Sequence, residues 1–300
     1  MKILVTGRNG QVGGALLHTL SGLGEIVAVD RSHMDLSQPD SIRSVIRREC
    51  PALIINAAAY TAVDQAESDV VMANAINAQA PGVLAEEAKK IGAALIHYST
   101  DYVYDGSKAS PWVETDATRP LCVYGQSKLA GEQAITSVGL PHLILRTSWV
   151  YGLHGKNFLL TMLRLAETRP ELSIVDDQIG APTWSQTIAR ATADIVRMLR
   201  DPAALTERSG IYHLCAHGQT SWYGFAGKIF SQPLLAHRPT PILKPISTAE
   251  YPTPAQRPKN SVMNTNKFEQ YFGKLPQWDD ELAACMAHIP TEAPHLLKAN

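Results

Sequence analysis

A tyrosine and a lysine four positions apart, Tyr124 and Lys128, are the residues of this chain whose types and spacing most clearly allow chemistry. The segment from Tyr124 to Val138 has helical periodicity, and four residues make about one helical turn, so both side chains lie on one face of the helix. An ammonium group beside a phenol favours the phenolate, because a nearby opposite charge stabilises the ionised form. We therefore expect Tyr124 to donate and accept a proton near neutral pH.

Polar segments follow two apolar runs that we predict to be strands. The run Ala93–His97 leads into Ser-Thr-Asp-Tyr-Val-Tyr-Asp-Gly at 99–106, and the run Ala52–Asn56 leads into Ala-Ala-Ala-Tyr-Thr at 57–61. In an open parallel sheet, ligands bind beyond the carboxyl ends of the strands. Both polar segments are therefore predicted to lie at the same edge of a sheet.

A glycine-rich turn follows the first predicted strand, Lys2–Thr6. Gly7, Gly10 and Gly13 stand in the spacing Gly-x-x-Gly-x-x-Gly, and residues 11–20 continue with helical periodicity. Strand, glycine turn and helix form the setting in which backbone N–H groups approach a pyrophosphate at a helix N-terminus. This order predicts a dinucleotide site, and an ordinary glycine-rich loop is the alternative.

The second predicted strand, Glu25–Val29, ends in two residues that argue for different cofactors. An acidic residue at Asp30 would accept hydrogen bonds from a ribose 2′-hydroxyl and favour NAD, whereas Arg31 would hold the 2′-phosphate of NADP. The preference between NADPH and NADH stays open. Asp35 and Leu36 are expected to contact the adenine, with a helix cap as the alternative for Asp35.

Short apolar strands alternate with helical segments from residue 1 to about 147. This alternation predicts an α/β fold, a doubly wound parallel sheet that is Rossmann-like. The rhythm changes after residue 147, so 1–147 is expected to be the dinucleotide-binding domain, completed by parts of 185–215. Residues 148–300 are expected to form mainly a smaller, partly discontinuous substrate lobe, with irregular structure in the proline-rich stretch 232–260.

Composition excludes several classes of protein. A net charge of -1 over 300 residues gives no basis for binding nucleic acid or a membrane surface. We find no apolar run of the roughly 18 residues that span a bilayer, and the apolar segment at 1–7 is too short for a signal peptide. The scattered Cys50, Cys122, Cys215 and Cys285 indicate reduced thiols in the cytoplasm, and the histidines show no metal-site spacing.

Taken together, these motifs carry a family resemblance. In order along the chain they are Thr-Gly-x-x-Gly-x-x-Gly (6–13), Asn-Ala-Ala-Ala-Tyr-Thr-Ala-Val-Asp (56–64), Ser-Thr-Asp-Tyr-Val-Tyr-Asp-Gly (99–106), Tyr-x-x-x-Lys (124–128), Arg-Thr-Ser-Trp-Val-Tyr-Gly (146–152), Gly-Lys-Asn-Phe (155–158), Asp-Gln-x-Gly-x-Pro-Thr (177–183) and Arg-Pro-x-Asn-Ser (257–261). The chain resembles the extended short-chain dehydrogenase/reductase superfamily, and within it the reductases of dTDP-linked 4-keto deoxyhexoses.

The resemblance implies the roles of the three catalytic residues. Thr100 would hydrogen-bond the substrate carbonyl, and Tyr124 would protonate the carbonyl oxygen as hydride arrives from NADPH or NADH. Lys128 would hold the nicotinamide ribose and support proton transfer by the tyrosine. The substrate implied is a nucleotide sugar whose 4-keto group is reduced.

The same resemblance implies two further sets of residues. Those that would line the pyrophosphate or border the cofactor are Gly7, Gly10, Gln11, Val12, Gly13, Ala57, Ala58 and Ala59. Those that would face the substrate are Tyr102, Val103, Trp149, Asn157 and Arg257, the last because a guanidinium binds a diphosphate bidentately.

Structural roles are the alternatives for several of these residues. Trp149 is equally suited to packing, and Arg257 to a surface ion pair. Acidic residues at Asp64 and Glu67 are also what the first turn of a helix favours. Gln178 is equally suited to shaping a turn.

Rival functions differ in which residues they need. Dehydratases of the superfamily place an Asp-Glu pair after the threonine, but here Tyr102 follows Asp101, which counts against elimination. Another 4-ketoreductase, an epimerase, and a non-enzymatic regulatory subunit of the same fold remain alternatives. Some members of the family carry a metal-binding Glu at a dimer contact where this chain has Gly14-Ala15, so we expect no metal, and a homodimer stays open.

Overall fold

A parallel sheet forms the centre of the computed structural model, which describes residues 1–198, 205–236 and 240–289. Within these ranges the sheet has six strands in the order β10-β5-β4-β3-β1-β2. The strands are β1 (Lys2–Thr6), β2 (Glu25–Val29), β3 (Leu53–Asn56), β4 (Ala94–Thr100), β5 (His142–Thr147) and β10 (Gly210–His213). All neighbouring pairs are parallel, and the direction of winding reverses between β1 and β3, which is where doubly wound sheets bind ligands.

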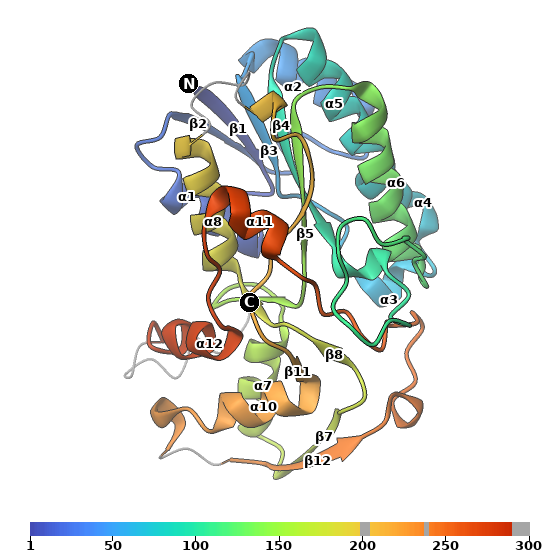
Figure 1. The fold of residues 1–300 in the computed structure, drawn as a ribbon, viewed down its shortest axis with the longest axis vertical. Helices are drawn as coiled ribbons and strands as arrows, with labels where there is room; N and C mark the ends of the chain where they lie inside the picture. Colours follow the sequence, from blue (N-terminus) through green and yellow to red (C-terminus); the bar gives the residue numbers. More distant parts are fainter. Residues whose placement is uncertain (199–204, 237–239, 290–300) are drawn as a thin grey trace.

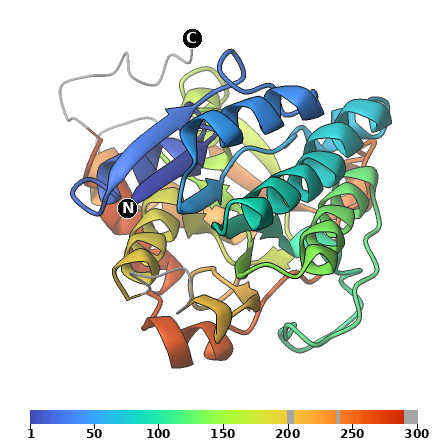
Figure 2. The same ribbon diagram turned by 90° about the horizontal axis from the view of Figure 1, so that it is seen from above.

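Helices cover both faces of this sheet (Figure 1). One face carries α1 (Gln11–Thr19), α8 (Ser185–Met198) and α11 (Asn266–Phe272). The other face carries α2 (Pro39–Glu49), α4 (Val70–Asn74), the π-helical segment η1 (Ala75–Gln79), α5 (Ala80–Lys90) and α6 (Val123–Val138). Figure 2 shows α5 and α6 side by side on their face. The prediction of a doubly wound parallel sheet is confirmed.

The strands alternate between two apolar cores. Ile3 and Val5 pack with α1 and α8, whereas Leu4 packs with α2 and α5. A strand buried on both faces is apolar throughout, and β1 and β3 can therefore be recognised in the sequence as short uninterrupted apolar runs.

A helix predicted over Val70–Ile91 divides into α4, η1 and α5. Asn77 lies in the π-helical turn, where its amide accepts from the backbone N–H of Tyr60 at 2.8 Å and donates to the Ser127 hydroxyl at 3.1 Å. A Cβ at Gly131 would lie 2.1 Å from the Asn77 carbonyl oxygen, so glycine lets α6 pack against this turn.

Below the sheet lies a smaller part of the protein with its own apolar core (Figure 1). Its elements are β6 (Val150–Tyr151), α7 (Phe158–Ala166), β7 (Glu171–Val175), β8 (Ile179–Gly180), β9 (Thr183–Trp184), β11 (Thr220–Ser221), α10 (Trp222–Phe230), η3 (Pro233–Leu235), β12 (Ile242–Ile246), η4 (Thr248–Glu250) and α12 (Trp278–Met286). In the stretch predicted to be irregular, β12 pairs in parallel with β7 and tolerates Pro245 because only β7 lies beside it. The predicted ends of one helix at Leu199 and of the lobe at 290–300 lie outside the described residues.

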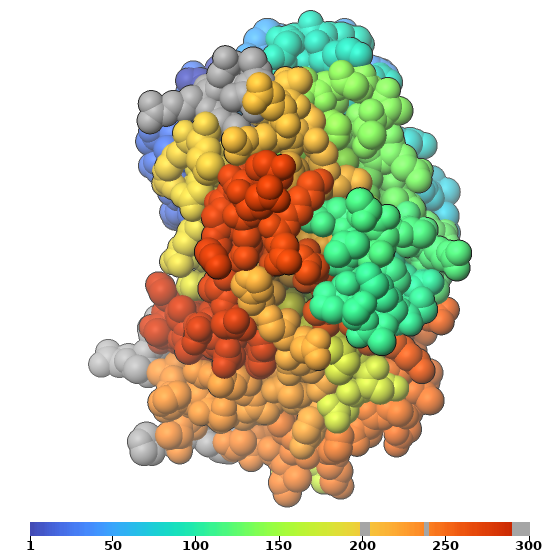
Figure 3. Space-filling view, viewed as in Figure 1, coloured from blue at the N-terminus to red at the C-terminus, as the bar shows by residue number. Residues whose placement is uncertain are grey.

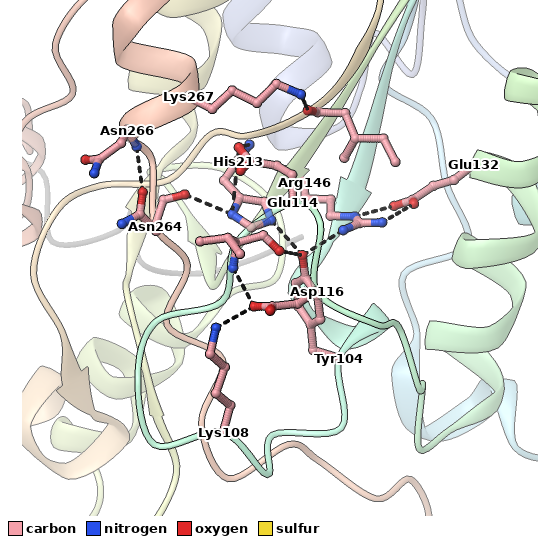
Figure 4. Close-up of polar contacts among 12 residues, drawn as sticks. Tyr104, Lys108, Glu114, Asp116, Glu132, Arg146, His213, Asn264, Asn266 and Lys267 are labelled. Atoms are coloured by element: carbon pink, nitrogen blue, oxygen red, sulfur yellow. Dashed lines mark hydrogen bonds and ion pairs between the residues drawn. The ribbon is translucent and has the colours of Figure 1, made fainter.

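A buried ion pair fastens α6 to the sheet (Figure 4). Arg146 on β5 donates to both carboxylate oxygens of Glu132 on α6, at 2.9 and 2.6 Å, and each side chain is 2% exposed. The Arg146 guanidinium also donates to the Tyr104 hydroxyl at 2.7 Å, which lies 2.8 Å from Nε2 of His213. Burial lowers the pKa of His213 to about 3, so the ring is neutral. This network holds α6 against β5.

The segment that carries Tyr104 continues over the surface beside α11 (Figure 3). Tyr104 stacks on Trp112 with ring centroids 4.5 Å apart, and the backbone N–H of Trp112 donates to the Val262 carbonyl at 2.8 Å. These contacts tie the segment after β4 to the chain near Met263. In the described ranges, none of the helices combines the length and the apolar content that crossing a bilayer requires.

We expect Arg146→Ala to lower the free energy of unfolding by about 3–5 kcal/mol, because it leaves the Glu132 carboxylate buried without its partner. Arg197→Ala is the matched control, since it breaks an exposed pair with Asp194 and should cost less than about 0.5 kcal/mol. Urea unfolding measures both. Equal losses for the two variants would contradict an anchoring role for Arg146.

Candidate active site

A cleft of about 740 Å³ opens at the carboxyl edge of the sheet, where β1, β3 and β4 end. The predicted residues that line it after β1 are Gly7, Gly10, Gln11 and Val12. Those that line it after β2 are Asp30, Arg31, Asp35 and Leu36, and those after β3 are Ala57, Ala58 and Ala59. The predicted residues from later segments are Thr100, Tyr102, Tyr124, Lys128 and Trp149. The topology thus brings most of the predicted residues together around one cleft.

The backbone of the glycine turn packs closely against neighbouring backbone segments. Gly7 has a φ of +71° and its carbonyl accepts from the N–H of Gly10 at 2.8 Å. A Cβ at Gly7 would lie 2.9 Å from the backbone nitrogen of Ala58. Gly13 does not line the cleft. It lies behind the turn, where a Cβ would meet the Gly7 carbonyl oxygen at 2.0 Å. Glycine at position 13 lets α1 pack against the turn.

Asp30 is held by its own loop. Its carboxylate accepts from the backbone and hydroxyl of Ser32 at 3.0 and 2.6 Å and contacts Nδ1 of His33 at 2.7 Å. The bonds from Ser32 and His33 hold the pKa of Asp30 well below its usual range, so the group is ionised. Asn9, which the sequence did not single out, reaches the same carboxylate at 3.4 Å.

Asp35 shapes the turn before α2. It accepts from the backbone and hydroxyl of Ser37 at 2.9 and 2.7 Å, and Arg31 reaches it at 3.4 Å. The residue at the cap of α2 is Gln38, so the alternative of Asp35 as the helix cap does not hold.

Tyr124 lies in the first turn of α6 with its ring edge-on to Tyr102, 5.5 Å between centroids. Burial raises the pKa of Tyr124, and hydrogen bonding with the Thr100 hydroxyl offsets only part of that rise. The phenol therefore keeps its proton at neutral pH. The expectation that Lys128 favours the phenolate is not met, because burial, which spacing alone does not reveal, is the largest effect on the pKa of Tyr124.

The ammonium of Lys128 is committed to other partners. It donates to the carbonyl of Tyr98 at 2.6 Å and lies 3.1 Å from Nε2 of His97. Burial lowers the pKa of Lys128 to about 8, and the charge of Glu132 one turn along the helix opposes that shift.

Thr100 ends β4 and is hydrogen-bonded on both sides. Its hydroxyl donates to Asp101 at 3.0 Å and accepts from the backbone N–H of Tyr102 at 3.2 Å. Asp101 also accepts from Ser148 at 2.9 Å, and burial raises the pKa of its carboxyl group. Asp101 lines the cleft but was not among the predicted site residues, although its place directly after Thr100 was the available signal.

Trp149 forms part of the cleft wall in an unusual backbone conformation. Its φ is +46°, in the left-handed region that bulky residues rarely adopt, and its indole stacks on Trp222 with centroids 3.6 Å apart. A Cβ at Gly180 would lie 2.4 Å from the indole. Trp222 also lines the cleft and was missed, because no motif marks it.

Three predicted substrate residues do not line the cleft, namely Val103, Asn157 and Arg257. Val103 is fully buried in the core near Tyr104. Asn157 caps α7 by accepting from the N–H of Leu160 at 3.1 Å and donates to Gln11 at 3.0 Å. The sequence carried no sign of this second bond, which joins positions 146 residues apart.

Arg257 donates to Asp64 at 2.9 Å, as the ion-pair alternative anticipated. Glu67 accepts from the backbone N–H of Val123 at 2.8 Å, at the start of α6. An acidic group there satisfies a free N–H and faces the positive end of the helix. Glu67 therefore helps to place the helix that carries Tyr124.

Comparison with known proteins shows which family the chain belongs to. Residues 1–290 match the family model described as RmlD substrate binding domain. A dTDP-4-dehydrorhamnose reductase of Burkholderia thailandensis is 47% identical over 96% of this chain and 99% of its own length. The chain belongs to the dTDP-4-dehydrorhamnose reductase family. A member from Escherichia coli K12 is 46% identical over 93% of this chain and 94% of its own length.

A solved structure extends the comparison. The dTDP-4-dehydrorhamnose reductase of Bacillus anthracis in complex with NADP has a TM-score of 0.85 and 35% identity, over 95% of this chain and 98% of that one. The family resemblance drawn from the motifs is confirmed. Among the described residues, no group of three or more His, Cys, Asp or Glu side chains is arranged to hold a metal ion.

We expect Gly13→Ala to push α1 away from the turn, because its Cβ would overlap the Gly7 carbonyl oxygen. The expected cost is about 1–3 kcal/mol of unfolding free energy, together with weaker binding of NADPH in a fluorescence titration. Gly14→Ala is the control, since its Cβ would meet Arg8 at 3.5 Å and a helical alanine is favoured over glycine. NADPH binding unaffected by Gly13→Ala would count against the proposed packing role.

Proposed function

We propose that this member of the family reduces the 4-keto group of dTDP-4-dehydro-L-rhamnose to dTDP-L-rhamnose with NADPH or NADH, for the synthesis of rhamnose-containing polysaccharide. The observation that carries the proposal is that Thr100, Tyr124 and Lys128 line the same cleft as the glycine turn. The names of the relatives at 46–47% identity supply the substrate.

The cleft suits a dinucleotide. Gly7 allows the turn to pack against the backbone of Ala57 and Ala58, and the N-terminus of α1 offers backbone N–H groups to a pyrophosphate. Asp30 and Arg31 both line the adenosine end, which fits binding of either nicotinamide cofactor. When bound, the reduced nicotinamide supplies the hydride.

The protein's own part of the reaction is proton donation and positioning. Tyr124 donates its phenolic proton to the oxygen that becomes the 4-hydroxyl group. Lys128 is proposed to hold the nicotinamide ribose and to support this proton transfer. Thr100 contacts the same oxygen. Its single proton is committed to Asp101 while Asp101 is ionised, and a protonated Asp101 donates to Thr100 and frees that proton for the substrate.

The substrate is assigned to the far side of the cleft. Tyr102 and Trp149, which line the cleft, are proposed to face the sugar. Arg257 does not line the cleft and donates to Asp64, so its contact with the diphosphate is proposed from the family resemblance alone. Val103 and Asn157 remain proposals as substrate residues, and the contacts described above support a positioning role for each.

The wider organisation is part of the same proposal. Residues 1–147 with parts of 185–215 bind the cofactor, supported by the pairing of β10 with β5 and by α8 packing on α1. Most of 148–300 binds the sugar. A cytoplasmic location is supported by four free cysteines.

Mixing the protein with dTDP-4-dehydrorhamnose and NADPH should lower the absorbance of the reduced nicotinamide in step with product formation. If NADPH binds, as measured by fluorescence, but is not consumed, the result would contradict the proposal and favour a regulatory binding role. Isomerised sugar without net NADPH consumption would instead indicate an epimerase.

We expect Tyr124→Phe to lose about 10²–10⁴-fold in kcat while NADPH affinity stays within twofold or so, because only the proton donor is removed. Tyr271→Phe, on the exposed surface, is the control and should retain full turnover. Activity close to wild type in Tyr124→Phe would place the proton donor elsewhere.

A further inference from the structure

Three polar side chains stand in a row across the interior of the sheet. Thr6, Asn56 and His97 occupy paired positions on β1, β3 and β4, so they lie side by side on the face that α6 covers. Each is 1% exposed. Buried polar groups at this depth persist only where their hydrogen bonds are satisfied.

Hydrogen bonds join this row to Lys128. Lys128 Nζ lies 3.1 Å from His97 Nε2, and His97 Nδ1 lies 2.9 Å from the side-chain amide of Asn56. The same amide lies 2.7 Å from the hydroxyl of Thr6, which accepts from the backbone N–H of Ala58 at 3.0 Å. An unbroken path thus leads from the ammonium to the wall of the cleft, which Thr6 lines.

The path has one complete donor pattern when Lys128 is charged. An ammonium group can only donate, so His97 Nε2 accepts and the neutral ring carries its proton on Nδ1. That proton goes to the amide oxygen of Asn56, and the amide nitrogen then donates to Thr6. Thr6 accepts twice and keeps its own proton free for an acceptor in the cleft.

The reverse pattern becomes available when Lys128 is neutral. The amine can then accept from His97 Nε2–H, and His97 Nδ1 accepts from the amide nitrogen of Asn56. Thr6 now donates to the amide oxygen, as the structure has it. The two patterns differ by a half-turn of the amide and by the tautomer of His97.

We propose that His97 is a positioning residue for Lys128, and that His97 and Asn56 switch together between these two patterns. The charge of Lys128 then decides whether the Thr6 hydroxyl donates into the sheet or into the cleft. Since this coupling is reciprocal, an acceptor on a bound dinucleotide that takes the Thr6 proton favours the charged form of Lys128. That last step rests on the proposed function, whereas the switch itself does not.

The groups around Lys128 are suited to such a switch. The titratable side chain in contact with its ammonium is His97 on β4, and Glu132, one turn along α6, is paired with Arg146 of β5. Tyr124 lies one turn before Lys128 on the same helix. Burial and the nearby Lys128 hold the pKa of His97 well below its usual range, so the ring stays neutral. Lys128, with a pKa of about 8, changes charge in an accessible range.

The test is the nitrogen NMR spectrum of the histidine rings in the cofactor-free protein from about pH 6.5 to 9.5. Signals of His97 are those missing from His97→Gln. We expect the ring proton on Nδ1 at the acid end and on Nε2 at the alkaline end, with a midpoint near pH 8. One unchanged tautomer throughout, or a doubly protonated ring, overturns the proposal.

His213 is the internal control. It is equally buried, but its Nδ1 faces the carbonyl of Asn264 at 2.9 Å, which can only accept, so it should carry its proton on Nδ1 at every pH. Asn56→Asp provides a second arm, because a carboxylate cannot donate and should hold His97 in its Nδ1–H form across the range. A His97 that still switches in Asn56→Asp would contradict the coupling. These measurements need no substrate or cofactor, so failure of the proposed function would leave their outcome intact.

Discussion

The buried ammonium of Lys128 is the constraint around which the site is arranged. A charge removed from water is tolerated only where partners compensate its lost hydration. The carbonyl of Tyr98 and the ring of His97 supply hydrogen bonds, and Glu132 supplies opposite charge one helical turn away. Because Glu132 is itself held by Arg146, the ammonium, α6 and β5 form one connected unit.

The fold places Tyr124 by fixing α6 at several points. Glu67 binds the first turn of the helix, and Arg146 holds its middle through Glu132. A Cβ at Gly125 would lie 2.3 Å from the Tyr102 carbonyl oxygen, so glycine allows the helix to approach the segment after β4. The proton donor therefore depends on contacts from three separate parts of the chain.

Features governed by local sequence were predictable. β1 and β2 begin and end where their apolar runs do, and the glycine turn lies in the predicted cleft. Features that depend on distant partners were not. The Arg257–Asp64 pair joins residues 193 positions apart, Asn157 is used as a helix cap that also binds Gln11, and the raised pKa of Tyr124 follows from burial that no spacing encodes.

In the proposed reaction, hydride from the cofactor reaches C4 of the sugar while the protein supplies the proton to oxygen. The direct measurement is NMR of the product formed from NADPH that carries deuterium at the transferable C4 position of its nicotinamide. The account predicts one deuterium at C4 of the hexose for each NADPH consumed. A product without deuterium at C4, or one that acquires it there from heavy water instead, would contradict the account.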